Sequence, residues 1–278
     1  MRKILFLSIV FVLLTVIGYS SYQLLEIHRN TTQEAEVHRW LMQYHPLSRP
    51  SGSAEIAAET SMTETPGGTP AETSGETPAE TADLSPTPKI VNQSIVDLQT
   101  GHPDVVGWLM IENTRIDYPF AQGIDNDYYL HLDLNERWSA AGTIFMDFRN
   151  SRDFSDFHTI LYGHHMQNGS MFGTLQQFSN PSFFDDNRTG TIFLAHATYE
   201  IEIIAFAVIP PNDAVIYHSL LQADEDRVAF LDHVRSVARH YREVGATAQD
   251  RIITLSTCNY EFQNARMVLI GRLVERCG

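Results

Sequence analysis

Short runs of β-branched and apolar residues recur through the last two thirds of the chain and predict a protein built mainly of strands. Two of these runs, Arg251 to Cys258 and Ala265 to Leu273, are joined by the polar residues 259–264 and predict an antiparallel hairpin. Earlier strands are expected over Trp108 to Ile111, in a second run that ends at Tyr118, within Gly142 to Asn150, and over Thr159 to Tyr162. Two more are expected within Thr189 to Pro210.

Apolar residues recur at helical spacing in three other places. A short helix is expected to end near Gln99, and a second is expected over Met171 to Phe178. Asp224 to Val244 has the pattern of an amphipathic helix, with its apolar residues along one face. This third helix interrupts the strands just before the hairpin, in an insertion that starts near Pro210. We expect most of it to serve packing.

The N-terminal segment has the pattern of a membrane span. An apolar run from Ile4 to about Leu25 is long enough to cross a bilayer as a helix, and Arg2 and Lys3 favour a cytoplasmic N-terminus. A cleaved signal peptide is the alternative, but no clear A-x-A-like site follows Gly18. We therefore expect residues 1–25 to form an uncleaved single-pass anchor in the cell membrane, with the remainder extracellular.

Composition divides the rest of the chain into three parts. Residues 26–47 are polar and rich in helix formers, which predicts a juxtamembrane segment with helical character. Residues 48–89 are rich in Ser, Thr, Pro, Gly, Glu and Ala and contain TPAET twice, so they bury too little apolar surface to fold and are expected to be a disordered acidic spacer. Residues 90–278 are the expected globular domain. The net charge of -15 argues against a nucleic-acid partner.

The predicted hairpin gives Cys258 a chemical setting. Side chains alternate across a strand, so Cys258 shares a face with Ser256, while Leu255 points into a core. Arg266 begins the return strand opposite Cys258, and a guanidinium beside a thiol favours the thiolate. Cys277 lies eleven residues beyond Arg266. At about 3.3 Å per residue that separation is roughly 35 Å, too far for a disulfide with Cys258.

Several motifs together resemble the class B sortases, the cysteine transpeptidases of Gram-positive cell envelopes. The motifs are GWLMIENTRIDYPFAQGIDNDYYL, GTIFMDFRN, YGHHM, and TLSTC with its downstream Arg, and the resemblance extends from about Ile90 to Val274. It implies a mainly β fold with helices: a sortase-like closed barrel of about eight strands, with an N-terminal helix and a helix-bearing insertion before the cysteine strand. One departure is Asn259, because some class B enzymes have an acidic residue directly after the cysteine.

The resemblance also implies the catalytic residues. Cys258 is the expected nucleophile and Arg266 the expected stabiliser of the oxyanion. The sortase catalytic histidine directly follows a glycine, which selects His164, and His165 is expected to be structural or solvent-facing. Ser256 and Tyr217 are expected to contact substrate. No cofactor and no metal are expected.

The implied partners are surface proteins that carry a sorting signal, with an amine of the cell wall as acceptor. Two alternatives stay open: a pilus polymerase that uses a pilin lysine, and a catalytically inactive, membrane-tethered binding module.

Other chemistries fit the sequence less well. Tyrosine phosphatases have a shorter loop between Cys and Arg than the seven residues here, zinc sites need more thiolates or a tight His cluster, and papain-like proteases place Cys before His.

Overall fold

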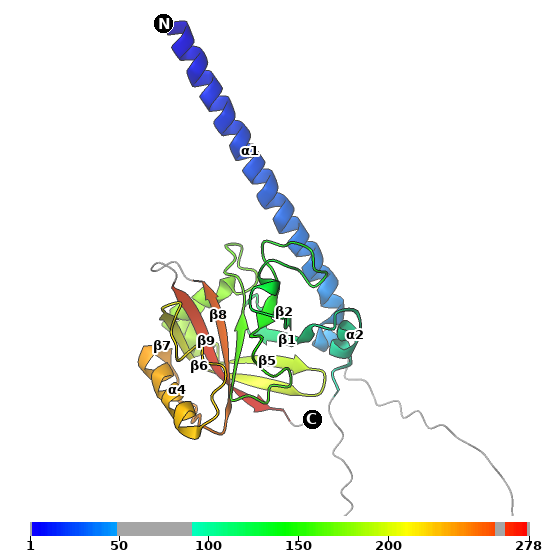
Figure 1. Cartoon of the computed structure of the whole chain (residues 1–278), viewed down its shortest axis with the longest axis vertical. Helices are drawn as coiled ribbons and strands as arrows, with labels where there is room; N and C mark the ends of the chain where they lie inside the picture. Colours follow the sequence, from blue (N-terminus) through cyan, green and yellow to red (C-terminus); the bar gives the residue numbers. More distant parts are fainter. Residues whose placement is uncertain (1, 49–90, 259–264, 277–278) are drawn as a thin grey trace, which may run out of the picture.

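A computed structural model describes residues 2–48, 91–258 and 265–276, and Figure 1 shows them as a β-barrel from which one long helix projects. Residues 49–90, which hold nearly all of the expected spacer, and residues 259–264, which join the expected hairpin, lie outside the described residues. The helices are α1 (Arg2–Leu41), α2 (Gln93–Gly101), α3 (Pro181–Asp186) and α4 (Asp224–Val237), with 3₁₀ turns η1 (Met42–Tyr44), η2 (Pro46–Ser48), η3 (Tyr128–Leu130) and η4 (Gly173–Ser179).

The strands of the described chain form one sheet that closes on itself. In sheet order they are β5 (Thr189–Leu194), β1 (Val105–Ile111), β2 (Asp117–Ala121), β3 (Ile144–Met146), β4 (His158–Tyr162), β8 (Arg251–Cys258), β9 (Arg266–Glu275), β6 (Thr198–Ile209) and β7 (Ala238–Tyr241). Because β5 also pairs with β6, the first eight of these close into a barrel, and β7 lies outside the ring. This arrangement confirms the predicted fold class.

The long strand β6 makes the closure possible. Its first part, Thr198 to Glu202, pairs with β5, and its later part, Ala205 to Ala207, pairs with β7 along the same edge. The register with β9 shifts between Ile203 and Ala205. A bulge of this kind bends a strand and increases its twist, so one strand can complete the barrel and then leave it.

The predicted hairpin is present as β8 and β9. Its inward residues Ile253 and Leu255 belong to the core inside the barrel, as the alternation predicted. The opposite face of β8 does not face solvent. Thr254 and Ser256 are both buried there, because the insertion between β6 and β8, with α4, packs over that face. The polar residues of the cysteine strand therefore lie beneath a second layer.

Two predicted helices differ from the structure. The helix expected over Asp224 to Val244 ends at Val237, and Ala238–Tyr241 form β7 instead. The edge of β6 offers unpaired backbone groups there, and pairing with it outweighs the local helical pattern. The segment expected as a helix over Met171 to Phe178 is the 3₁₀ turn η4, Gly173–Ser179.

The C-terminal end of helix α1 packs against the barrel, and its N-terminal part projects away from it (Figure 1). Leu41 is buried in a core with Ile95 and Trp108, and the His45 ring that follows donates to Asp117 Oδ1 at 3.0 Å. The expected anchor, Ile4 to Leu25, lies in α1, where the side chains of residues 4, 5 and 7–9 are outside the described set. Within what is described, no helix has both the length and the apolar character needed to cross a membrane.

Candidate active site

Three strands bring the predicted catalytic residues to one edge of the barrel. Strands β4 and β8 are parallel neighbours, and Tyr162 lies opposite Ser256. Each chain continues two residues further, to His164 and to Cys258, and the Gly163 N–H donates to the Ser256 carbonyl at 3.2 Å. His164, two residues beyond β4, and Cys258, the last residue of β8, thus lie at the same end of adjacent strands.

The third predicted residue comes from β9. Cys258 is the register partner of Arg266 in the antiparallel β8–β9 pair, which confirms the pairing expected from the sequence. Arg266 is half-buried, and its Nη1 also donates to the Ala265 carbonyl at 3.4 Å. The Cys258 side chain and residues 259–264 lie outside the described part, so the geometry rests on the backbone of β8 and β9.

His164 is held as a neutral imidazole with a defined tautomer. Its Nε2 donates to the Leu130 carbonyl at 2.7 Å, so the proton is on Nε2. The ring stacks on His131 with centroids 5.3 Å apart. Burial lowers the pKa of His164, the Leu130 carbonyl partly offsets this, and the charge of His131 lowers it further. A histidine with a lowered pKa is neutral at pH 7, and once protonated it gives up its proton more readily than an ordinary histidine.

The backbone around His164 is constrained by tight packing. The Phe172 N–H donates to the His164 carbonyl at 3.0 Å, which folds the following loop back over the site. A Cβ at Gly163 would lie 2.9 Å from the Phe172 ring, so a glycine is needed directly before the histidine. This close approach gives a physical reason for the Gly-His order in the sequence.

His165 has a different environment from the one that strand alternation predicted. Strand β4 ends at Tyr162, so alternation does not extend to residue 165. Instead His165 forms an isolated antiparallel bridge with Met171, across the loop that follows His164. It is half-buried, and the bridge ties it to the loop.

The two predicted substrate contacts, Ser256 and Tyr217, meet each other. The Tyr217 hydroxyl lies 2.9 Å from Ser256 Oγ, and the Tyr217 ring stacks against Tyr162 with centroids 6.3 Å apart. Tyr217 is half-buried, whereas Ser256 is fully covered. The phenol of Tyr217 is therefore placed beside the cysteine strand by a residue two positions before Cys258.

A polar cluster beneath Tyr217 and Tyr162 was not predicted from the sequence. Asp147 follows β3 and is completely buried, and it accepts hydrogen bonds from Arg149, Asn126 and Tyr162. The available signal was the Asp-x-Arg order directly after the apolar run IFM. An acidic residue there suggests a turn, and only the fold reveals its partners.

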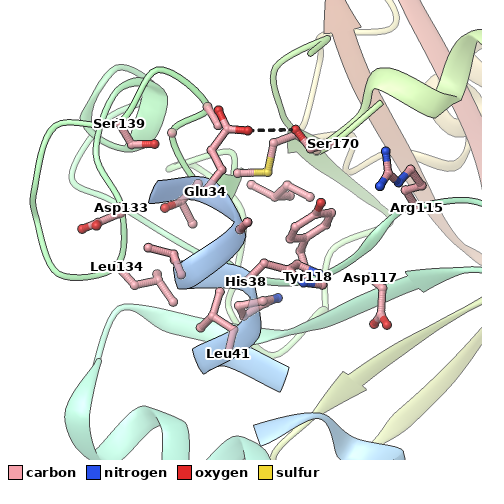
Figure 2. A pocket seen from close by; sticks show the side chains of 18 of the residues that line it. Glu34, His38, Leu41, Arg115, Asp117, Tyr118, Asp133, Leu134, Ser139 and Ser170 are labelled. Carbon is pink, nitrogen blue, oxygen red and sulfur yellow. Dashed lines mark hydrogen bonds between the residues drawn. The ribbon is translucent and has the colours of Figure 1, made fainter. Parts of the chain in front are cut away.

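The structure also contains a cavity of about 800 Å³ between the end of α1 and the barrel. Figure 2 shows Glu34 and His38 of α1 lining it together with Tyr118 and Ser170. Glu34 accepts hydrogen bonds from Asn168 Nδ2 at 3.1 Å and from Ser170 Oγ at 3.4 Å, on the loop that follows His164. The described residues that line this cavity include none of the predicted catalytic set, although the cavity borders the loop after His164.

Comparison with known proteins gives consistent matches. The chain is 39% identical over 189 residues to sortase B of Listeria monocytogenes, covering 67% of this chain and 76% of that protein. It is 30% identical over 187 residues to sortase B of Staphylococcus aureus, covering 66% of this chain and 76% of the relative. A scan against protein-family models found no match.

Solved structures agree. A mutant form of Clostridium perfringens sortase B superposes with a TM-score of 0.63 at 32% identity, covering 66% of this chain and 87% of that one. Sortase B from the type II pilus of Streptococcus pneumoniae superposes with a TM-score of 0.57 at 37% identity, covering 65% and 98%. The barrel and the strand ends thus define a protein of the sortase class, the cysteine transpeptidases. Within that class, the chain belongs to the sortase B family.

Proposed function

We propose that this protein is a cell-envelope transpeptidase that cleaves a sorting-signal peptide and joins its acyl part to an amine of the cell wall. The single observation that carries the proposal is the meeting of three strand ends. Parallel β4 and β8 lead to His164 and Cys258, and Arg266 is the register partner of Cys258.

In the proposed mechanism the Cys258 thiolate attacks the carbonyl carbon of the scissile peptide bond. The resulting oxyanion is stabilised by the Arg266 guanidinium and by backbone N–H groups. His164, in its protonated form, gives its proton to the departing amine, the C–N bond breaks, and a thioester remains on Cys258.

An incoming amine then resolves the thioester. His164, now neutral, removes a proton from the amine as it attacks, the C–S bond breaks, and the new amide leaves with the thiolate regenerated. When no amine is present, water can replace it and the reaction becomes hydrolysis. Tyr217, positioned by Ser256, supplies the wall of the substrate site.

The exposed surface of α1 supports attachment to a membrane. Side chains such as Phe11, Leu14 and Ile17 are more than half exposed, and a contiguous apolar surface of this kind favours a lipid or protein environment. We propose that this end of α1 associates with the cell membrane and that the barrel lies on the extracellular side. Removal of residues 1–25 should move the protein from the membrane fraction to the soluble fraction.

A second candidate function is pilus assembly. It is favoured by the similarity to the sortase B from the type II pilus of Streptococcus pneumoniae, at 37% identity. In that case the acceptor would be a lysine side chain of a pilin rather than an amine of the wall. The chemistry at Cys258 would be unchanged.

The test is a transfer assay with a library of fluorescent sorting-type peptides and two kinds of amine, oligoglycine and a lysine-containing peptide. Transfer to oligoglycine supports wall anchoring, whereas transfer to lysine alone supports pilus assembly. Binding of peptide without cleavage, together with an unreactive Cys258, would identify an inactive binding module and overturn the proposal.

A further inference from the structure

Asp147 is a buried carboxylate placed at the junction of several chain segments. Its Oδ1 accepts from Arg149 Nε at 2.8 Å and from the Arg149 backbone N–H at 3.0 Å. Its Oδ2 accepts from Arg149 Nη2 at 2.7 Å, Tyr162 Oη at 3.0 Å and Asn126 Nδ2 at 3.1 Å. The residue has no exposed surface. These hydrogen bonds therefore compensate one carboxylate that is completely removed from water.

The partners of Asp147 come from separate parts of the chain. Asn126 lies in the loop after β2, and its Oδ1 also accepts from the Phe148 N–H at 3.0 Å. Tyr162 is the last residue of β4. Arg149 reaches the insertion, because its Nη2 also donates to the Tyr217 carbonyl at 3.3 Å. One Asp–Arg pair thus connects a loop, a barrel strand and the insertion.

The same connections lead to the catalytic strand ends. Tyr162 is two residues before His164 and lies opposite Ser256, which is two residues before Cys258. Tyr217 stacks on Tyr162 and is hydrogen-bonded to Ser256. We call Asn126, Tyr162 and Tyr217 the groove wall; Tyr162 and Tyr217 both lie beside Ser256, two residues before the predicted nucleophile, and Asn126 is joined to them through Asp147.

We propose that Asp147 and Arg149 are positioning residues that hold the groove wall in the geometry required to bind the sorting-signal peptide beside Cys258. The inference rests on the proposed function, since it assigns a role in binding that substrate. Neither residue needs to touch the reacting atoms. Burial alone would raise the pKa of Asp147, but the hydrogen bonds from Arg149 and Asn126 keep this pKa below its usual value, so the carboxylate stays charged.

Two substitutions separate the parts of this arrangement. Asp147→Asn keeps the side-chain shape but removes the charge and leaves the Arg149 guanidinium without its carboxylate. Arg149→Lys keeps the positive charge, yet an ammonium cannot span both carboxylate oxygens and the Tyr217 carbonyl. The Arg149 side chain is 38% exposed, whereas Asp147 is completely buried, so we expect Arg149→Lys to disturb folding less than Asp147→Asn. Arg149→Lys therefore keeps the test possible if Asp147→Asn does not fold.

A matched control is available elsewhere in the barrel. Glu202 accepts two hydrogen bonds from Arg272, between β6 and β9. Arg272 lies six residues beyond Arg266 on β9, about 20 Å away at about 3.3 Å per residue. Glu202→Gln therefore weakens another Arg–carboxylate pair of the barrel, in which both hydrogen bonds reach the single oxygen Oε2, at a distance from the groove wall, and peptide binding should not change.

The experiment compares wild type, Asp147→Asn, Arg149→Lys and Glu202→Gln at a temperature at which each is fully folded by circular dichroism. We expect KM for a fluorescent sorting-type peptide to rise at least tenfold in the Asp147 and Arg149 variants. The rate at which iodoacetamide alkylates Cys258 should stay within about twofold, because neither substituted residue lies on the cysteine strand or its hairpin partner and the thiolate keeps Arg266 beside it. Glu202→Gln should match wild type in both measurements.

An unchanged KM in folded Asp147→Asn or Arg149→Lys, or an equal loss in Glu202→Gln, would overturn the positioning role. Peptide binding to Cys258→Ala forms of the same variants distinguishes a failure of the positioning role from a failure of the proposed function. If wild type does not transfer peptide but Cys258→Ala binds it, weaker binding in the Asp147→Asn background supports the inference. If no form binds peptide, the positioning role is wrong together with the proposed function.

Discussion

Protonation of His158 should make the protein lose stability as the pH falls, and the size of the effect follows from its surroundings. His158 lies on β4 and has no exposed surface. Its Nδ1 lies 3.1 Å from the His218 carbonyl, which can only accept, so Nδ1 carries the proton. Its Nε2, 2.8 Å from Thr254 Oγ1, then accepts from that hydroxyl. The ring packs on Phe230 of α4, with centroids 4.4 Å apart.

This environment suits only the neutral imidazole. Burial lowers the pKa of His158 from 6.5 to about 4. In the unfolded chain the residue binds a proton near its ordinary pKa, so between about pH 6.5 and 4 the unfolded state binds more protons than the native state. Stability therefore falls as the pH falls through this window. At about 1.4 kcal/mol per pH unit, the loss of unfolding free energy caused by His158 reaches about 3 kcal/mol near pH 4. Above about pH 7 this loss is absent.

The assay is urea denaturation of wild type and His158→Gln at several pH values between about 4 and 7.5. Glutamine does not titrate in this range, so the difference between the two slopes of unfolding free energy against pH isolates His158 from the other histidines. We expect the wild type to lose about 3 kcal/mol more than the variant between about pH 7 and 4. Parallel pH dependences, or an NMR titration of His158 near its ordinary pKa of about 6.5, would refute this reasoning.

Three further predictions concern the site and the N-terminal segment. His164→Ala should lower the transfer rate by roughly two to four orders of magnitude, whereas His165→Ala should retain most activity because its bridge to the loop serves structure; the reverse order would exchange their roles. Arg266→Lys should be severely impaired, because an ammonium lacks the guanidinium fork, and full activity would reduce Arg266 to a generic charge. Leu41→Ala should destabilise the protein by about 2 kcal/mol in thermal unfolding. A chain that begins at Ile90 should fold cooperatively but with a lower Tm than the full chain. An unchanged Tm in both variants would mean that α1 does not pack as described.

Alternation along the strands was sufficient to predict the hairpin because the two faces of β8 have different surroundings. Ile253 and Leu255 fill the barrel, and the register this imposes places Cys258 opposite Arg266. The same reasoning failed where tertiary pairing competes with local pattern. Residues 238–241 continue the helical spacing of α4, but the free edge of β6 makes them a strand.

Local sequence pattern predicts only part of the candidate site: it pairs Cys258 with Arg266 but does not identify the histidine. His164 was selected by the resemblance, since the spacing of twelve histidines could not select one. The role of Asp147 could not be predicted from the sequence. Its partners Asn126 and Tyr162 lie 21 and 15 residues away, and nothing in a single sequence shows that these side chains meet. The burial of Ser256 was also unpredicted, since it depends on how the insertion folds back over β8.

Intact-protein mass spectrometry tests the central claim most directly. The protein is mixed with a sorting-type peptide in the absence of amine, quenched in acid and digested to locate any acyl group. A single adduct on Cys258, absent from Cys258→Ala and discharged as an amide when oligoglycine or a lysine peptide is added, is the predicted result. An adduct on Cys277, or an adduct that persists in Cys258→Ala, would contradict the assignment of Cys258 as the nucleophile.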